Sequence, residues 1–108
     1  LPVATDKADP SWFGYLLTVK EGSGFTRMDF INHLEGNKIQ TRSYFSGNIL
    51  YHPGYQHIAK EYENLQDEFP IAHQVTFNSF FLGTFAGITD EKLSYIKSVV
   101  DRFFAEHV

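Results

Sequence analysis

The sequence predicts an α+β fold in which a small, mainly antiparallel sheet is covered by helices. Short runs rich in aromatic and β-branched residues occur at three places and predict strands. Two other segments combine helix-start signals with apolar residues at helical spacing. Because the chain has 108 residues, it suits one domain that spans residues 1–108.

The first strand is expected over residues 12–20, where large apolar side chains recur at every second position. The residues expected on one face of it are Phe13, Tyr15, Leu17 and Val19. This alternation is typical of a strand that has one face on a core.

A helix is expected over residues 27–36, because its start can be recognised from side-chain chemistry. Thr26 can cap the free amides, and Asp29 lies three residues further on, as in a capping box. Phe25 and Phe30 occupy the positions of a hydrophobic staple. Together these signals fix where the helix begins.

The middle of the chain carries weaker signals. Gly36-Asn37 is expected to close the helix in a left-handed conformation. Residues 38–45 predict a second strand whose mixed polarity suggests a sheet edge or a site. Residues 46–56, with two Gly and a Pro, are expected to form a loop without regular structure. Residues 57–69 predict a thin amphipathic helix or a variable insertion.

The C-terminal part is the clearest. Pro70 is expected to open a short helix that runs to about Phe77. Residues 80–85 form a dense aromatic run that suits a buried strand, and Thr89 caps a last helix over residues 90–106. The apolar stripe of this helix consists of Leu93, Ile96, Val99, Val100, Phe103 and Phe104.

Composition excludes several classes of partner. The formal charge is -4 and no segment gathers basic residues, so we expect no nucleic-acid partner. No apolar run approaches the roughly 20 residues of a membrane span, so we expect no membrane partner. The sequence has no Cys, and its five His share no ligand spacing, so we expect no metal site. A cytoplasmic location fits the lack of cysteine.

Three blocks of sequence carry a resemblance. The first is Leu1-Pro2-Val3-Ala4-Thr5 with Asp9-Pro10-Ser11-Trp12-Phe13-Gly14, the second is residues 41–48 (TRSYFSGN) and the third is residues 78–89 (NSFFLGTFAGIT). Together they resemble the C-terminal domain of the DegT/DnrJ/EryC1/StrS family. They are most similar to its branch of pyridoxamine-phosphate-dependent sugar-nucleotide 3-dehydrases, which act in deoxysugar and lipopolysaccharide biosynthesis. The likeness is weakest over residues 55–69.

The resemblance implies the small C-terminal domain of an aspartate-aminotransferase-like enzyme. A larger cofactor-binding domain, absent from these residues, would hold pyridoxamine or pyridoxal phosphate and a His base. No cofactor is expected on this chain alone, and none of its residues is expected to be catalytic. The complete enzyme would remove the C3 hydroxyl of a CDP-4-keto-6-deoxyhexose, form a homodimer and receive electrons from an NAD(P)H-dependent reductase.

The resemblance also nominates site residues. Phe13 would replace a His of the related aminotransferases as an active-site wall, although it could equally be strand core. Arg42 suits a pyrophosphate, or is a surface residue of an edge strand. Asn48 could bind sugar hydroxyls, or be a turn residue in a left-handed conformation. Ser11 and Trp12 could line the same mouth, although the indole could instead anchor the strand.

Two alternatives to a dehydrase stay open. A Lys in place of the His base would indicate the C-terminal domain of a sugar aminotransferase. The lack of a self-contained site is also compatible with an interaction module without catalytic role. In a domain severed from a larger fold, we expect exposed apolar surface that includes Trp12 or Phe45.

Overall fold

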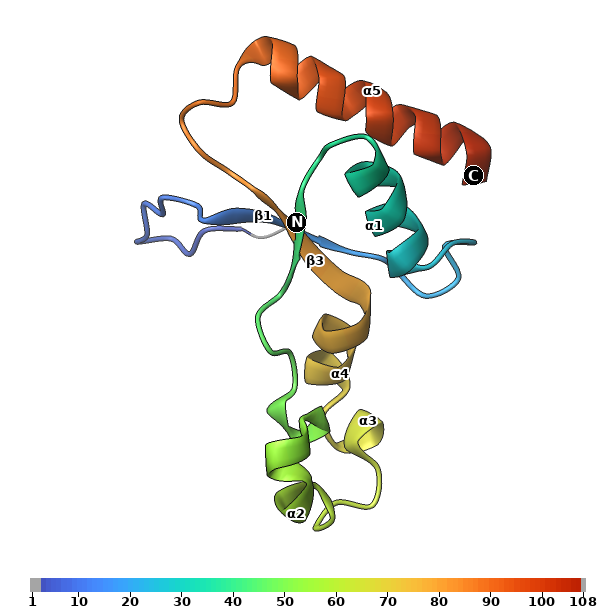
Figure 1. Cartoon of the computed structure of the whole chain (residues 1–108). Helices are drawn as coiled ribbons and strands as arrows, with labels where there is room; N and C mark the ends of the chain where they lie inside the picture. The colour runs from blue at the N-terminus through green and yellow to red at the C-terminus, as the bar shows by residue number, and fades with distance from the viewer. Residues whose placement is uncertain (1–2, 108) are drawn as a thin grey trace.

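A three-stranded antiparallel sheet lies at the centre of the computed structural model, which describes residues 3–107 (Figure 1). The strands are β1 (Gly14–Thr18), β2 (Thr41–Ser43) and β3 (Ser79–Gly83), in the order β1-β3-β2. The last strand in the sequence is therefore the central one, and the two others are edges. The predicted α+β class and antiparallel sheet are confirmed.

The register divides the sheet into two faces. Phe80 lies opposite Leu17 of β1, whereas Phe81 lies opposite Leu16 of β1 and Arg42 of β2. Opposed residues in antiparallel strands point to the same side, and successive residues point to opposite sides. Phe80 therefore belongs to one face, and Phe81 and Arg42 belong to the other.

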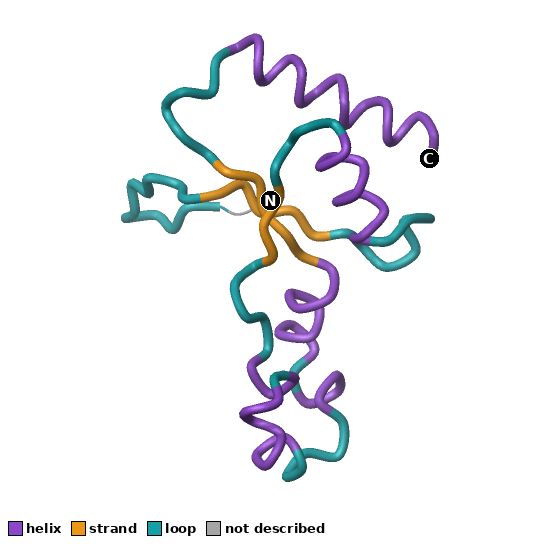
Figure 2. The backbone as a smooth tube through the Cα atoms, viewed as in Figure 1, coloured by secondary structure: helices purple, strands orange, loops and turns teal. Residues whose placement is uncertain are grey.

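Helices α1 (Arg27–Gly36) and α5 (Asp90–His107) cover the Phe80 face (Figures 1 and 2). The buried residues of the resulting core are Phe30, Leu34, Ile39, Phe80, Val99 and Phe103. The ring of Phe30 meets Phe80 edge-on at 5.7 Å and stacks on Phe103 at 4.7 Å between centroids. One aromatic ring thus joins the sheet to both helices.

The start of α1 has the predicted capping box. The amide of Asp29 donates to Thr26 Oγ1 at 3.2 Å, and the amide of Thr26 donates to the Asp29 carboxylate at 2.8 Å. The Thr26 hydroxyl donates to the same carboxylate at 2.6 Å. The staple rings of Phe25 and Phe30 lie 6.0 Å apart. The predicted bounds of this helix are confirmed.

The end of α1 differs from the prediction. Asn37 has φ -96° and is not left-handed; Lys38, with φ 63°, takes that conformation instead. The amide of Lys38 donates to the carbonyl of Glu35, and the amide of Ile39 donates to that of Leu34, both at 3.0 Å. This pair of bonds is a Schellman motif, whose apolar contact is supplied by the buried Leu34 and Ile39. The motif places Lys at a position that glycine usually occupies.

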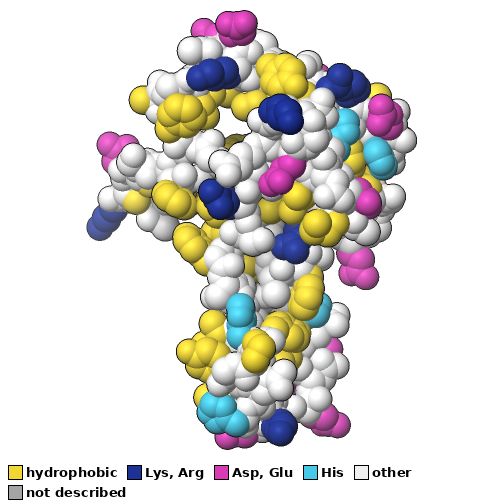
Figure 3. Space-filling model, in the orientation of Figure 1, with side chains coloured by type: hydrophobic (Ala, Val, Ile, Leu, Met, Phe, Trp, Pro, Cys, Tyr) yellow, Lys and Arg dark blue, Asp and Glu magenta, His cyan; other side chains and the backbone are white. Residues whose placement is uncertain are grey.

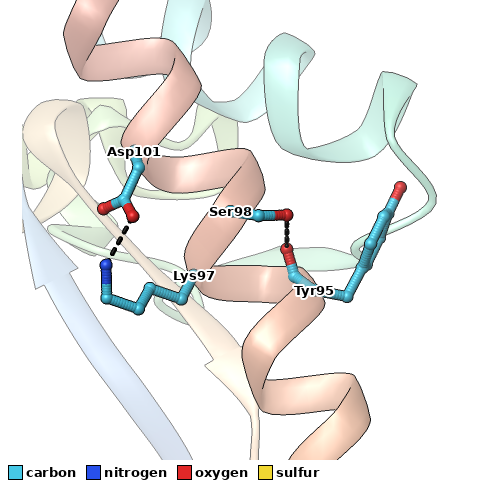
Figure 4. A network of polar contacts seen from close by, with 4 residues as sticks. All are labelled: Tyr95, Lys97, Ser98 and Asp101. Atoms are coloured by element: carbon cyan, nitrogen blue, oxygen red, sulfur yellow. Dashed lines mark hydrogen bonds and ion pairs between the residues drawn. The ribbon is translucent and has the colours of Figure 1, made fainter.

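Side chains of α5 hold the end of α1. The Tyr95 hydroxyl donates to the carbonyl of Asn37 at 3.0 Å, and Arg102 donates to the Asn37 side chain at 2.9 Å. Figure 4 shows Tyr95 reaching away from α5, while Lys97 and Asp101 pair along the helix one turn apart. The exposed ion pair adds little to stability, whereas the contacts to Asn37 fix how α5 lies on α1.

Another contact joins α1 to the edge strand β2. Glu35 accepts from the Thr41 hydroxyl at 2.6 Å and from the Thr41 amide at 3.2 Å. These two bonds, the hydroxyl first, lower the pKa of Glu35 below its ordinary value. Thr41 is buried, so this carboxylate fixes the start of the strand that carries Arg42.

Residues 49–78 form an arm that extends from the sheet, away from α1 and α5 (Figures 1 and 2). Its elements are η1 (Ile49–Tyr51), η2 (Pro53–Tyr55), α2 (Gln56–Ala59), α3 (Leu65–Glu68) and α4 (Pro70–Asn78). Arg27 of α1 donates to the carbonyls of Thr76 and Ser79, both at 3.1 Å. This side chain ties the arm to the main body.

Two predictions for the arm are wrong. Residues 46–56 contain two short 3₁₀ helices rather than no regular structure. Residues 57–69 do not form one helix, because Asn64 starts a new one: its side chain accepts from the amide of Gln66 at 2.9 Å. The helix expected from Pro70 is confirmed as α4 and is one residue longer than expected.

The strands are shorter than predicted. The segment expected over residues 12–20 is regular only from Gly14 to Thr18, and that over residues 80–85 becomes Ser79–Gly83. The segment over residues 38–45 is reduced to Thr41–Ser43, since Phe45 leaves the extended region with φ 50°. Within residues 3–107, no helix has the length and apolar character needed to cross a membrane.

Replacing Lys38 by Gly should stabilise the protein. A left-handed backbone costs an L-residue with a side chain about 1 kcal/mol more than glycine. The Tm should therefore rise by about 4 °C in thermal unfolding followed by circular dichroism. Lys60→Gly is a matched control, because Lys60 is an exposed lysine with φ -66° and gains nothing from glycine. A Tm for Lys38→Gly at or below that of the unaltered chain would contradict the prediction.

Acid should weaken the fold through Glu35 and Asp29. Hydrogen bonds from Thr26, its hydroxyl first, also lower the pKa of Asp29. A carboxylate with a lowered native pKa stabilises fully above its ordinary value, here 4.5 for Glu35 and 3.8 for Asp29. This stability is lost as the pH falls through the lowered value, because the unfolded chain binds the proton first. Urea unfolding at a series of pH values measures the loss.

Glu35→Gln should remove the contribution of Glu35 to that pH dependence, because the side chain no longer titrates. Thr41→Val should remove part of it, because the variant loses the hydroxyl bond to the carboxylate but keeps the bond from the Thr41 amide. A slope in Glu35→Gln equal to that of the unaltered chain would show that the bond does not contribute.

Candidate functional site

The face of the sheet that carries Phe81 has no helix over it and is covered by aromatic side chains. We call the set of Phe13, Tyr44, Phe45 and Phe81 the aromatic face. Ring centroids lie 5.5 Å from Phe81 for Phe13, 6.2 Å for Phe45 and 6.5 Å for Tyr44. Phe81 is buried beneath them, whereas Phe13 and Phe45 are each 71% exposed. Figure 3 shows hydrophobic side chains at the surface beside the sheet.

Gly14 makes room for this arrangement. A Cβ atom at Gly14 would lie 2.5 Å from Cδ2 of Phe81, closer than real side-chain contacts allow. The ring of Phe81 can therefore lie over β1 only because residue 14 has no side chain. In the Phe13-Gly14 pair, the ring of Phe13 packs beside the ring of Phe81, and Gly14 leaves the room that the ring of Phe81 occupies.

Phe13 is not part of the helix-covered core. Since β1 begins at Gly14, the expected alternation of Phe13 with Tyr15 does not hold, and the ring of Phe13 packs on Phe81 instead. The interpretation of Phe13 as strand core is wrong. Its position on the exposed face is compatible with a wall of a site.

Two adjoining hollows lie on the aromatic face. One has a volume of about 430 Å³ and is lined by Arg42, Thr84 and Phe85 as well as by rings of the aromatic face. The other, of about 300 Å³, is lined by Trp12 and Tyr44. Phe13, Phe45 and Phe81 contribute to both hollows.

Of residues 3–107, Arg42 is the only charged one in the lining of either hollow. Its backbone belongs to edge strand β2, and its side chain is on the same face as Phe81. An exposed guanidinium beside aromatic rings is suited to phosphate or carboxylate groups, which it can bind with two parallel hydrogen bonds. The structure thus brings Phe13 and Arg42, which the sequence analysis nominated separately, to one face of the sheet.

Trp12 and Ser11 precede the aromatic face. Trp12 is 49% exposed and lines the smaller hollow, so its indole does not anchor the strand by burial. Its carbonyl accepts a hydrogen bond from Thr84 Oγ1 at 2.5 Å, which links the two segments just beyond the Gly14–Gly83 end of the β1-β3 pair. Ser11 is exposed and lines neither hollow. The exposed apolar surface expected at Trp12 and Phe45 is confirmed.

Asn48 lies away from the two hollows. Its side chain is buried, and Oδ1 caps η1 by accepting from the amide of Leu50 at 3.0 Å. Its φ of -76° shows that the left-handed interpretation is wrong; Gly47, with φ 60°, takes that conformation. Among the described residues, Nδ2 of Asn48 has no hydrogen-bond partner.

Sequence reasoning missed the conformation of Phe45. The only positive-φ residues outside glycine in residues 3–107 are Lys38 and Phe45. The signal available in the sequence was the Gly47-Asn48 pair, which marks a tight turn shortly after an aromatic residue.

The histidines occupy structural positions. Each of four makes a hydrogen bond: His33 with the Val99 carbonyl, His52 with the Ser46 carbonyl, His73 with the Tyr51 hydroxyl and His107 with the Phe103 carbonyl. Within residues 3–107, no three His, Cys, Asp or Glu side chains are grouped so as to hold a metal ion.

Two larger hollows contain none of the predicted site residues, although the larger of the two shares Gln40, Gly83 and Phe85 with the hollow of Arg42. One, of about 690 Å³, lies between the start of α1 and the arm. The other, of about 850 Å³, lies between the first half of α5 and the end of β3. We place the candidate site on the aromatic face because it alone combines an exposed cation with several of the predicted residues.

The described residues do not form a complete site for pyridoxamine phosphate. The lining of the two hollows contains no Asp or Glu that could pair with a pyridine nitrogen, and Arg42 is its single phosphate-binding group. The aromatic face can supply one wall and one cation. The other groups that such a cofactor needs would have to come from outside these residues.

Comparison with known proteins tests the resemblance found in the sequence. Residues 1–101 match the model of the DegT/DnrJ/EryC1/StrS aminotransferase family. This match includes all three sequence blocks. Leu1 and Pro2 of the first block lie outside the residues that the structure describes.

Two curated relatives are similar over nearly the whole chain. A dTDP-4-dehydro-2,6-dideoxy-D-glucose 3-dehydratase of Saccharopolyspora spinosa is 38% identical over 106 residues, which are 98% of this chain and 22% of the relative. The lipopolysaccharide biosynthesis protein RfbH of Salmonella typhimurium is 36% identical over 104 residues, 96% of this chain and 23% of the relative. The chain thus spans little more than a fifth of the length of these relatives.

A solved structure shares the fold. The crystal structure of a GDP-4-keto-6-deoxymannose-3-dehydratase with a trapped PLP-glutamate geminal diamine superposes with a TM-score of 0.61 and 24% identity. The match covers 88% of this chain and 24% of that one. The sheet and helices described above therefore have the arrangement found in part of that protein. With a family model that matches nearly its whole length, the chain belongs to the DegT/DnrJ/EryC1/StrS aminotransferase family.

Proposed function

We propose that this chain is the C-terminal domain of a pyridoxamine-phosphate-dependent sugar-nucleotide 3-dehydratase. The observation that carries the proposal is the identity of 38% and 36% to two proteins of dehydratase and lipopolysaccharide-biosynthesis name over nearly all of the chain. The aromatic face adds physical support, because an apolar wall beside one exposed Arg is suited to a phosphate-bearing ligand.

In this proposal the domain shapes a site but does not carry out the chemistry. A preceding large domain of the complete polypeptide holds the cofactor and the His base, and the substrate is a CDP-4-keto-6-deoxyhexose or a related nucleotide sugar. The complete enzyme acts in the cytoplasm as a homodimer, and an NAD(P)H-dependent reductase supplies electrons. The 108-residue chain alone has no dehydratase activity.

Phe13 is the proposed active-site wall. A Phe side chain neither donates nor accepts a proton at neutral pH, so it excludes water from the reacting sugar without adding a competing acid or base. Arg42, on the edge strand at the other side of β3, binds the pyrophosphate of the nucleotide sugar. Trp12 lines the same mouth, whereas Ser11 and Asn48 are weaker candidates because neither lines the hollows.

A sugar aminotransferase is the second candidate function. The family is named for aminotransferases, and the aromatic face would suit either reaction. The two functions differ in whether the C3 oxygen is lost or an amino group is gained, so product analysis separates them.

Changing Phe13 to His in the complete polypeptide tests the proposed function. The unaltered enzyme, given pyridoxamine phosphate and the keto sugar nucleotide, should form 3-deoxy product as measured by mass spectrometry. Phe13→His restores the residue expected in aminotransferases and should lower C3 deoxygenation relative to amino transfer. Phe77→His, at a partly exposed Phe of the arm, is the control and should keep the original ratio. Amino sugar as the main product of the unaltered enzyme would favour the aminotransferase.

Replacing Arg42 by Ala in the complete polypeptide should weaken nucleotide-sugar binding by about 1.5 to 3 kcal/mol, the usual range for a lost charge-assisted hydrogen bond. Calorimetric titration measures this change. Arg42→Lys should bind with intermediate affinity, because it keeps the charge without the two-pronged geometry. Arg102→Ala, on α5, is the control for loss of one positive charge. If Arg42→Ala binds the nucleotide sugar with unaltered affinity, Arg42 is not part of the binding site.

A further inference from the structure

Phe45 has a backbone conformation that its side chain disfavours. Its φ is 50°, in the left-handed region that bulky residues rarely adopt. Its ring is 71% exposed, so burial of the ring does not account for the conformation. An unfavourable backbone persists only where the surrounding structure enforces it, and such positions concentrate at functional sites.

The turn that follows Phe45 is held by the end of α4. The amide of Asn48 donates to Thr76 Oγ1 at 2.7 Å, and the Thr76 hydroxyl donates to the carbonyl of Ala72 at 2.6 Å. Gly47 has φ 60°, and a Cβ atom there would lie 2.5 Å from Thr76 Oγ1. The turn is therefore packed backbone-to-helix at a place where only glycine fits.

Hydrogen bonds within the turn, together with the contacts to Thr76, hold residues 43–48 in place; we call this arrangement the clamp. The amide of Gly47 donates to the carbonyl of Tyr44 at 3.2 Å, and that of Phe45 donates to the carbonyl of Ser43 at 2.8 Å. His52 bonds the carbonyl of Ser46 at 2.8 Å. With every residue from Ser43 to Asn48 tied to a neighbour, the ring of Phe45 is presented in one direction.

That direction places the ring of Phe45 beside Phe13. The two rings are within 18° of parallel, with centroids 6.3 Å apart, and both rest on Phe81. Both rings line the hollow that contains Arg42 and the hollow that contains Trp12. A ligand that occupies both hollows therefore contacts these rings.

We propose that Phe45 is a ligand-binding residue whose clamped ring stacks against the base of a nucleoside diphosphate that reaches Arg42 with its phosphates. The inference rests on the proposed function and assigns a base-binding platform within that site. Among the described residues that line the two hollows, Arg42 carries the only charged side chain, and its guanidinium complements a diphosphate. The ring of Phe45, 71% exposed, complements a nucleobase, because stacking on aromatic side chains is favourable for every base.

The test compares binding and stability in the complete polypeptide. Cytidine, thymidine and guanosine diphosphate, inorganic pyrophosphate and pyridoxamine phosphate are each titrated by calorimetry. Phe45→Gly should weaken nucleoside diphosphate binding about tenfold and leave pyrophosphate binding unchanged, since it removes the stacking surface alone. Arg42→Ala should weaken both ligands. Phe45→Gly should keep or raise the Tm, because glycine accepts a positive φ.

Lys38→Gly is the matched control. It relieves the other positive φ outside glycine in residues 3–107, at a residue that lines neither hollow, and should change only the Tm. Phe45→Asn is a second variant, because Asn also tolerates the left-handed region but offers no aromatic ring. It should bind the nucleoside diphosphates as weakly as Phe45→Gly.

Several outcomes would overturn the inference. If both Phe45 variants bind nucleoside diphosphates with the affinity of the unaltered polypeptide, Phe45 does not bind the base and the inference is wrong. If Arg42→Ala still binds them more weakly in that case, the proposed function is not contradicted. Weaker binding of pyridoxamine phosphate alone would assign the ring to the cofactor. A large fall in Tm in both variants would make Phe45 a packing residue. If the unaltered polypeptide binds no nucleoside diphosphate, both the inference and the proposed substrate class fail.

Discussion

Phe80 and Phe81, adjacent residues of the central strand, determine what covers each face of the sheet. Because successive residues of a strand point to opposite faces, Phe80 and Phe81 commit β3 to an apolar environment on both sides. Phe80 is fully buried under the helices and meets Phe30. Phe81 has no helix above it and is covered instead by Phe13, Tyr44 and Phe45. One face is thus a folded core, and the other is an aromatic surface made of side chains that stay exposed.

The helix-covered core determines where Arg42 lies on the exposed face of the sheet. Helix α1 is fixed at its start by the capping box and at its end by the Schellman motif. From that position Glu35 holds Thr41, the first residue of β2, through two hydrogen bonds. Arg42 is the next residue and points to the opposite side of the sheet. A carboxylate on the helix-covered side therefore positions a guanidinium on the exposed side of the sheet through the intervening Thr41.

The arm contributes to the same face from a different direction. Thr76, near the end of α4, receives the amide of Asn48 and packs against Gly47. Arg27 bonds the carbonyl of Thr76 and so connects this contact to the start of α1. The turn that carries Phe45 is held between these elements, and its left-handed backbone is the consequence. In this turn the unfavourable backbone conformation of Phe45 costs stability, and it fixes where the ring of Phe45 lies.

The sequence by itself determined the elements whose signals are local. The start of α1 at Thr26, the opening of α4 at Pro70 and the buried strand at Phe80-Phe81 follow from capping, ring constraint and hydrophobic pattern within a few residues. The family resemblance also singled out Phe13 and Arg42, which the fold brings to one face. The tertiary structure alone decided that Lys38 rather than Asn37 is left-handed, that residues 57–69 break at Asn64, and that Phe45 turns out of its strand. Each of these depends on contacts with residues distant in the chain or on competition between caps, and local propensity is too weak to settle either.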